Sequence, residues 1–240
     1  MNNDVHRTKV LVKICGLREI AQVDAALDAG ADFLGVVFAQ SPRWITVERA
    51  RAIRARVGPR VEVVDATAAA FAAARHKTGR PLLVGVFANQ TPDEINRIAT
   101  EVDLDIVQLS GGEHPSLEGR LMRPVLRAVH VGPDDTAERI LAEAGRPPAT
   151  VTLLDTKGAL RGGSGRPFDW AIAEAVARAR PIMLAGGLTP DNVAEAIMSV
   201  MPWAVDVSSG VESVGQKDVA KIKAFVEAAK QAMQSTGAGV

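Results

Sequence analysis

The sequence predicts an α/β fold, a single-domain (β/α)8 TIM barrel with eight parallel strands. Three observations lead to this prediction. The chain has 240 residues, and about 250 residues is typical of such a barrel. Short apolar runs, many of them β-branched, alternate with segments of helical period. No cofactor fingerprint of the G-x-G-x-x-G kind occurs, which favours a closed barrel over an open dinucleotide-binding sheet.

Candidate strands follow one another along the whole chain. Most are continuously apolar, as expected for parallel strands that are covered on both faces. They span residues 9–15, 32–38, 81–87, 105–109, 124–130, 150–155, 181–186 and 204–207. No Pro/Ser-rich linker separates them, so we expect residues 1–240 to form one domain.

The segments between the strands carry helix signals of their own. Residues 91–94 (Thr-Pro-Asp-Glu) place a capping hydroxyl at Thr91, a proline at the first helical position and a glutamate at the third. Behind this cap, Ile95, Ile98 and Val102 form a stripe that one side of a helix can bury. We therefore expect a helix that begins after Thr91 and packs against the sheet.

Residues 58–80 break this rhythm, because they lie between the second helix, about 46–57, and the third strand. We expect Asp65 to cap an alanine-rich helix that runs to about His76. We interpret the segment as an insertion at the base of the barrel, which is the end formed by the N-terminal ends of the strands. Excursions at this end seldom take part in chemistry, so a structural role is favoured.

Composition excludes several classes of partner. The 28 basic and 28 acidic residues cancel, so no global field attracts nucleic acid or an anionic membrane. Cys15 is the single cysteine and cannot form an internal disulfide, and the first residues lack the apolar core of a signal peptide. No apolar run approaches the roughly 20 residues that cross a bilayer. We expect a cytoplasmic protein, and either a monomer or a homodimer fits the sequence.

Glycine-bearing turns follow the last three predicted strands, at residues 162–165, 186–187 and 208–210. Glycine permits positive φ and close approach of a ligand, while the backbone N–H groups supply hydrogen-bond donors. In a β/α barrel these turns meet at the mouth, where the C-terminal ends of the strands converge. The sequence therefore predicts that the mouth binds a phosphorylated small molecule.

Three side chains near strand ends are candidates for chemistry. Cys15 closes the first strand, although a lone cysteine is usually an inert buried side chain. Asp155 ends the sixth strand, where it serves either as a helix cap or as a partly buried acid. Arg43 follows the second strand, either as a solvated charge or as a bidentate partner for a substrate carboxylate. Position alone leaves both interpretations of each residue open.

Seven short segments occur together in the order and spacing of one family. They are residues 13–16 (Lys-Ile-Cys-Gly), 41–43, 108–111, 154–157, 162–165, 186–188 and 206–212. Any one of them is weak evidence, but seven in register at β/α spacing are specific. On these segments the chain closely resembles the phosphoribosylanthranilate isomerase family of tryptophan biosynthesis. The resemblance runs from about Lys9 to the C-terminal helix, except for residues 58–80.

This resemblance implies an Amadori rearrangement of N-(5-phosphoribosyl)anthranilate to 1-(2-carboxyphenylamino)-1-deoxyribulose 5-phosphate, without metal or coenzyme. It implies that Asp155 is the general acid and Cys15 the general base. It also implies that Arg43 binds the anthranilate carboxylate. The phosphate would be held by backbone amides near four residues, Gly163, Gly187, Ser209 and Gly210.

One departure and two alternatives accompany the resemblance. Ser110 stands where the family often has histidine, but neither proton transfer is assigned to that position. Another phosphosugar-binding barrel isomerase is the first alternative. A histidine-pathway enzyme would place aspartates where this chain has Cys15 and the segment 129–131, and an epimerase would need a metal set that the four histidines do not supply. The second is a non-catalytic phosphometabolite sensor, against which the joint presence of base, acid and arginine counts.

Overall fold

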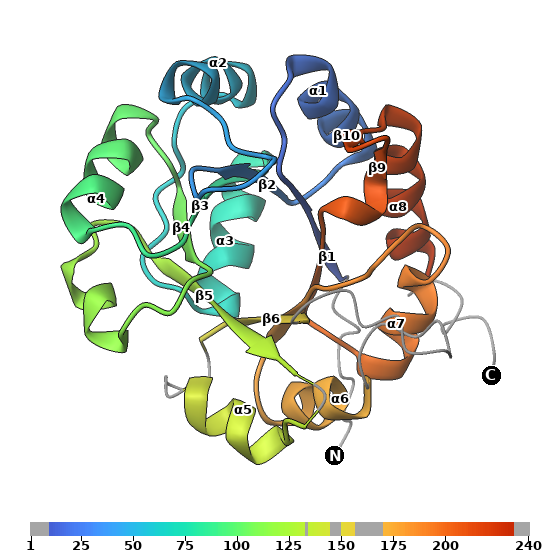
Figure 1. Cartoon of the computed structure of the whole chain (residues 1–240). Helices are drawn as coiled ribbons and strands as arrows, with labels where there is room; N and C mark the ends of the chain where they lie inside the picture. The colour runs from blue at the N-terminus through green and yellow to red at the C-terminus, as the bar shows by residue number, and fades with distance from the viewer. Residues whose placement is uncertain (1–9, 133, 145–149, 157–169, 233–240) are drawn as a thin grey trace.

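The computed structural model describes residues 10–132, 134–144, 150–156 and 170–232 of the chain. Eight parallel strands pair in sequential order, and β8 pairs with β1 to close the barrel (Figure 1). Each predicted strand overlaps an observed one, so the predicted fold is confirmed. The strands are β1 (Leu11–Cys15), β2 (Phe33–Val37), β3 (Leu82–Phe87), β4 (Ile106–Leu109), β5 (Val125–Val131), β6 (Thr152–Thr156), β7 (Ile182–Leu184) and β8 (Ala204–Val207).

Helices surround the barrel. The α-helices of this ring are α1 (Ile20–Ala29), α2 (Val47–Val57), α4 (Pro92–Glu101), α5 (Ala137–Ala144), α6 (Trp170–Ala179), α7 (Val193–Val200) and α8 (Val219–Ala232). A 3-10 helix, η1 (Pro115–Arg120), connects β4 to β5. After β8 come η2 (Ser209–Val211) and a hairpin of β9 (Glu212–Ser213) and β10 (Gln216–Lys217). Within the described ranges, no helix has the length and apolarity needed to span a membrane.

The start of α4 follows its sequence signal. The Thr91 side chain accepts a hydrogen bond from the Glu94 backbone N–H at 3.3 Å, and Pro92 occupies the first turn. Ile95 and Ile98 are buried, as the apolar stripe predicted. A cap of this kind contributes about 1 kcal/mol to helix stability, and the buried stripe attaches the helix to the barrel.

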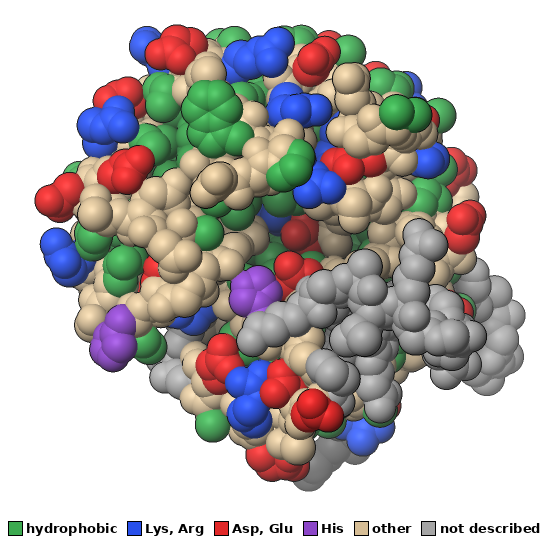
Figure 2. Space-filling model, in the orientation of Figure 1, with side chains coloured by type: hydrophobic (Ala, Val, Ile, Leu, Met, Phe, Trp, Pro, Cys, Tyr) green, Lys and Arg blue, Asp and Glu red, His purple; other side chains and the backbone are tan. Residues whose placement is uncertain are grey.

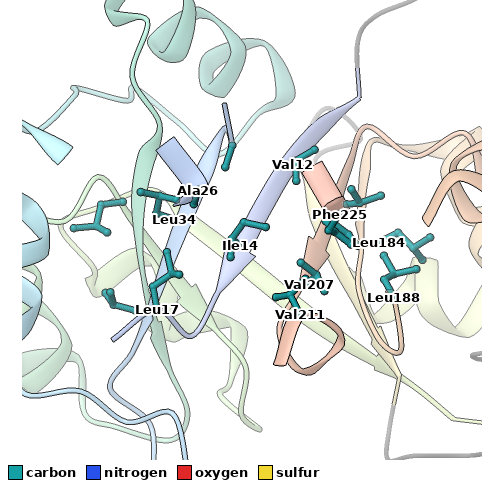
Figure 3. Close-up of a cluster of buried hydrophobic side chains, with 14 of the residues drawn as sticks. Val12, Ile14, Leu17, Ala26, Leu34, Leu184, Leu188, Val207, Val211 and Phe225 are labelled. Atoms are coloured by element: carbon teal, nitrogen blue, oxygen red, sulfur yellow. The ribbon is translucent and has the colours of Figure 1, made fainter. Parts of the chain in front are cut away.

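Alternate residues of each strand point to the outside and the inside of the barrel. On the outside of β1, Val12 and Ile14 belong to one buried cluster with Val207 of β8 and Phe225 of α8 (Figure 3). Burial of each such large apolar side chain stabilises the fold by about 1.5–3 kcal/mol. The intervening residues of β1 therefore face the barrel interior, and these include Lys13 and Cys15.

The segment between α2 and β3 covers the base of the barrel. It contains α3 (Ala68–Thr78), which is seen through the ring of strands in Figure 1 and not in the outer ring. The ring of Phe71 lies 6.0 Å from that of Phe33 and 5.9 Å from that of Trp203, at the N-terminal ends of β2 and β8. Thr67 forms a β-bridge with Thr150, just before β6. The rings and this bridge attach α3 to three strand ends.

Asp65 does not cap α3, so this part of the prediction was wrong. The cap is Thr67, whose Oγ1 accepts from the Ala70 N–H at 3.2 Å. The Asp65 Oδ1 instead accepts from the N–H and the hydroxyl of Thr67, at 2.9 and 2.6 Å. A carboxylate that bonds the backbone two residues ahead forms an Asx turn, and this turn places Thr67 at the helix start. The helix ends at Thr78, two residues later than expected.

Candidate active site

The mouth of the barrel carries the residues singled out from the sequence. Cys15 is the last residue of β1, and Asp155 lies near the end of β6. Leu153 packs inside the barrel with Val84 and Leu126, and Leu154 belongs to the outer cluster of Val12 and Ile14. Asp155 therefore faces inward by strand alternation. Figure 2 shows acidic and basic side chains gathered around a hollow at the centre of this face. The thiol and this carboxyl group are therefore at the same end of the barrel interior.

The thiol of Cys15 is almost enclosed, with 7% of the residue exposed. A Cβ placed on Gly35 of β2 would lie 2.9 Å from the Cys15 Sγ, so glycine at this position leaves room for the sulfur. A Cβ on Gly16 would lie 2.7 Å from the Arg43 Cδ. Arg43 thus packs against the residue that follows Cys15, and two of the predicted site residues are neighbours.

An ion pair lies inside the barrel one pleat below the thiol. The Lys13 Nζ is 3.0 Å from the Asp206 Oδ1, and these two residues are register partners in β1 and β8. Lys13 is completely buried, and Asp206 is 7% exposed. Burial by itself lowers the pKa of Lys13, but the charge of Asp206, and that of Cys15 when it is ionised, outweigh burial and raise that pKa. Lys13 is therefore cationic.

The thiol is subject to opposing influences. Burial raises the pKa of Cys15, the charge of Lys13 lowers it, the charge of Asp206 raises it, and the balance is a raised pKa. The free protein consequently holds Cys15 mainly as the thiol at neutral pH, since the ordinary pKa of a cysteine already lies above 7.

Arg43 is held in place by a carboxylate. Its Nε and Nη2 donate to the two oxygens of Glu212 at 2.6 and 2.8 Å. The Lys217 Nζ donates to Glu212 at 2.6 Å and to the Ser208 carbonyl at 2.9 Å. The Ser208 hydroxyl donates to the Cys15 carbonyl at 3.2 Å. Glu212 occupies the Nε side of the guanidinium, and among the described residues none hydrogen-bonds Nη1, so that side can bind a ligand.

Glu212 makes the stability of the fold depend on pH. Burial acts to raise the pKa of Glu212, but hydrogen bonds from Arg43 and Lys217 lower it from 4.5 to about 2. A depressed folded-state pKa adds stability that is present above the unfolded pKa and is lost as pH falls through the folded one. The wild type therefore loses stability as the pH falls. In Glu212→Gln the free energy of unfolding should fall by about 1–2 kcal/mol less over the same pH range, after allowance for solvent screening.

Urea unfolding at a series of pH values between 5 and 2 measures this effect. The matched control is Glu195→Gln, which removes an exposed carboxylate from the first turn of α7. The control should keep the wild-type pH dependence. If Glu212→Gln kept it as well, the ionised Glu212 would not stabilise the fold.

The glycine-bearing turns after β7 and β8 touch each other. Gly187 has φ of 66°, in the left-handed region that favours glycine. A Cβ on Gly210 would lie only 1.8 Å from the Leu188 carbonyl oxygen, so a larger residue does not fit there. Gly187, Ser209 and Gly210 are thereby brought together at the mouth. Gly163, the fourth residue of the expected phosphate site, lies outside the described residues.

Ser110, which stands where the family often has histidine, is hydrogen-bonded through both its side chain and its backbone. Its hydroxyl accepts from the Gln108 Nε2 at 2.9 Å, and its carbonyl accepts from the His130 Nε2 at 3.0 Å. His130 of β5 is the register partner of Asp155. An imidazole therefore lies beside Asp155 although β4 carries none.

Four charged residues in the mouth or just below it had no assigned role in the sequence-based prediction. Lys13 and Asp206 could have been recognised, because each is a charge within an apolar strand at an inward position. Glu212 and Lys217 gave no such signal, since their pairing with Arg43 depends on how the hairpin of β9 and β10 folds over the mouth.

Comparison with known proteins points to one family. The family model described as N-(5'-phosphoribosyl)anthranilate (PRA) isomerase matches residues 64–228, more than half of the chain. An N-(5'-phosphoribosyl)anthranilate isomerase of Dehalococcoides mccartyi is 44% identical over 229 residues, which cover 93% of this chain and 97% of that protein.

Solved structures agree with the sequence comparison. Phosphoribosylanthranilate isomerase from Thermotoga maritima superposes with a TM-score of 0.75 at 37% identity, over 92% of this chain and 99% of the other. A phosphoribosylanthranilate isomerase in complex with reduced 1-(o-carboxyphenylamino)-1-deoxyribulose 5-phosphate superposes with a TM-score of 0.71 at 36% identity, over the same shares. The chain belongs to the N-(5'-phosphoribosyl)anthranilate isomerase family.

Proposed function

We propose that this chain catalyses the isomerisation of N-(5'-phosphoribosyl)anthranilate in tryptophan biosynthesis. The chain belongs to a family of isomerases over almost its full length. The observation that carries the proposal is that Arg43 packs against Gly16, the residue that follows the inward-facing Cys15, in the mouth of the barrel. A proton acceptor and a carboxylate-binding cation are thus adjacent, as this substrate requires.

Two proton transfers account for the chemistry. Asp155 protonates the furanose ring oxygen, the C1–O bond breaks, and the nitrogen lone pair forms the iminium at C1. Cys15 as thiolate then removes the proton from C2, and the C–H electrons form the C1=C2 bond of an enolamine. Protonation at C1 and loss of the hydroxyl proton give the ketone. Since the iminium acidifies the neighbouring C–H, a base of modest strength is sufficient.

Binding at both ends positions the sugar between acid and base. Backbone amides near Gly163, Gly187, Ser209 and Gly210 hold the phosphate, and the Nη1 side of Arg43 binds the anthranilate carboxylate. The close packing of the turns after β7 and β8 supports this assignment, because it concentrates N–H donors in one place. Fixing the two ends uses remote binding energy to hold C1 and C2 in reactive geometry.

Arg43→Ala is expected to raise KM about ten- to a hundredfold with a smaller effect on kcat. The reason is that a hydrogen-bonded pair with a charged group contributes about 1.5–3 kcal/mol. Steady-state kinetics measure both constants. The matched control is Arg49→Ala, at an exposed position of α2.

A second substrate isolates the role of Arg43. An analogue that lacks the anthranilate carboxylate should be bound equally by the wild type and by Arg43→Ala. An unchanged KM for the natural substrate would refute the proposed carboxylate site.

Turnover tests the function itself. Consumption of phosphoribosylanthranilate changes its fluorescence, and the purified chain should produce this change catalytically. Tight binding without turnover would indicate a phosphometabolite sensor. Turnover of a histidine-pathway substrate alone would indicate another phosphosugar isomerase. Growth of a tryptophan auxotroph that lacks this step would establish the activity in a cell.

The remaining properties belong to the same proposal. Residues 1–240 form one barrel domain in which residues 58–80 are an insertion. The ligand is a phosphorylated small molecule, and the reaction uses no metal or coenzyme. The protein works in the cytoplasm, without nucleic acid or membrane partners, as a monomer or a homodimer.

A further inference from the structure

We propose that Lys13 is a positioning residue for this reaction, whose buried ammonium, anchored by Asp206, stabilises and orients the thiolate of Cys15. This inference rests on the proposed function, in which Cys15 is the base. Lys13 itself does not touch the substrate. It acts through the sulfur.

The geometry of β1 places the ammonium beside the sulfur. Lys13 and Cys15 are two residues apart, so both point into the barrel, with Lys13 one pleat further from the mouth. An ammonium has three donors. Its Nζ lies 3.0 Å from the Asp206 Oδ1, and the Lys13 charge also interacts with Cys15. Lys13 therefore connects the carboxylate below with the thiol above.

Stability alone does not explain this ion pair. Each charge that is moved into a barrel core loses several kcal/mol of hydration, and apolar residues of similar volume are often equally stable there. Val37 and Val86 pack their apolar side chains around Cys15, and the buried Gln108, the register partner of Val86, adds a polar but uncharged group to the interior. A cation and its counterion in this setting are explained if a neighbouring group must become an anion.

Charged groups reach Cys15 from several elements. Lys13 comes from β1, Asp206 from β8, Lys217 from β10, and Arg43 from the loop after β2. Both Lys217 and Arg43 bind Glu212 of β9, so one carboxylate is shared between the two upper cations. Among these cations Lys13 is completely buried, where charges interact most strongly. Of the groups that lower the pKa of Cys15, it has the largest effect.

Lys13 stays protonated throughout the step. The thiol first loses its proton to solvent at the open mouth, and the thiolate so formed is stabilised by the ammonium below it. The sulfur then takes the C2 proton, and the C–H electron pair moves into the enolamine. The ammonium supplies charge and direction without exchanging a proton.

The composition of the chain permits a direct test. Cys15 is the one cysteine, and the sequence contains no tyrosine, so the pH-dependent change in ultraviolet absorbance from thiolate formation reports Cys15 without overlap from tyrosinate. Lys13→Met should raise the pKa of Cys15 and lower the thiolate fraction at a given pH about tenfold or more, because a contacting opposite charge is lost. The value of kcat/KM at neutral pH should fall by a similar factor, mainly through kcat.

Asp206→Asn is the matched control, because it disturbs the same ion pair and predicts the opposite sign. It removes the negative charge that opposes the thiolate and leaves Lys13 in place. The pKa of Cys15 should therefore fall below that of the wild type. A role in folding alone would not produce opposite shifts from the two halves of one ion pair.

Two further measurements test the inference even if a single variant fails to fold. The double variant Lys13→Met/Asp206→Asn leaves no unpaired charge, and its thiol should titrate above that of the wild type. In the isotope-labelled wild-type protein, the NMR signal of the Lys13 ammonium should shift as Cys15 titrates, and this response should disappear in Cys15→Ser.

The outcomes separate this inference from the proposed function. Equal titration of Cys15 in the wild type and Lys13→Met, shifts of the same sign in both single variants, or an ammonium signal that ignores the thiol would each overturn it. If the wild type turns over substrate but the pKa of Cys15 is unchanged in Lys13→Met, the role of Lys13 is refuted and the proposed function stands. A wild-type protein without turnover would refute the proposed function, while the titrations would still test the coupling.

Discussion

Cys15→Ser is expected to lower kcat by about a hundred- to ten-thousandfold, with a small change in KM. Serine fills nearly the same space beside Gly35, but its hydroxyl forms an anion far less readily than a thiol does. The proton at C2 therefore loses its acceptor while the anchors for phosphate and carboxylate remain. Steady-state kinetics measure the loss, and urea unfolding establishes that the variant is folded.

An isotope effect identifies the step that has slowed. With substrate deuterated at C2, Cys15→Ser should show a larger primary isotope effect on kcat than the wild type, because C–H cleavage becomes rate-limiting. Near-wild-type turnover in this variant would exclude Cys15 as the base.

Asp155→Asn is expected to lower kcat to a similar extent, about a hundred- to ten-thousandfold, for a different reason. Asparagine keeps the shape of the side chain at the end of β6 but has no acidic proton for the ring oxygen. Ring opening should then limit the rate.

The two variants are distinguished by the same deuterated substrate. In Asp155→Asn the isotope effect should be suppressed, because the slow step precedes C–H cleavage. A raised isotope effect in this variant, or an unchanged kcat, would contradict the assignment of Asp155 as the acid.

The barrel could be predicted because its determinants are local. Continuous apolar runs mark buried parallel strands, and signals such as Thr91 followed by Pro92 mark helix starts, so each unit is identifiable without its neighbours. The candidate site followed from the fold, since residues at the C-terminal ends of strands converge. For this reason the proximity of Cys15 and Arg43 was within reach of the sequence.

The parts that could not be predicted depend on contacts between distant segments. Glu212 orients Arg43 only because the hairpin of β9 and β10 folds back over the mouth, which no local pattern indicates. Asp65 and Thr67 are both residue types that cap helices. Asp65 forms an Asx turn with Thr67, and Thr67, two residues later, caps α3. Lys13 and Asp206 stand out in the sequence as charged residues within apolar strands. Their pairing could not be predicted, because it depends on β8 pairing with β1 to close the barrel.

The aromatic cluster of Phe33, Phe71 and Trp203 at the base of the barrel has a kinetic consequence. Together with the side chains that fill the barrel interior, these rings close the base, so substrate enters and product leaves through the mouth. Departure of one molecule must then precede arrival of the next. Accumulated product should bind at the same site as the substrate and act as a competitive inhibitor.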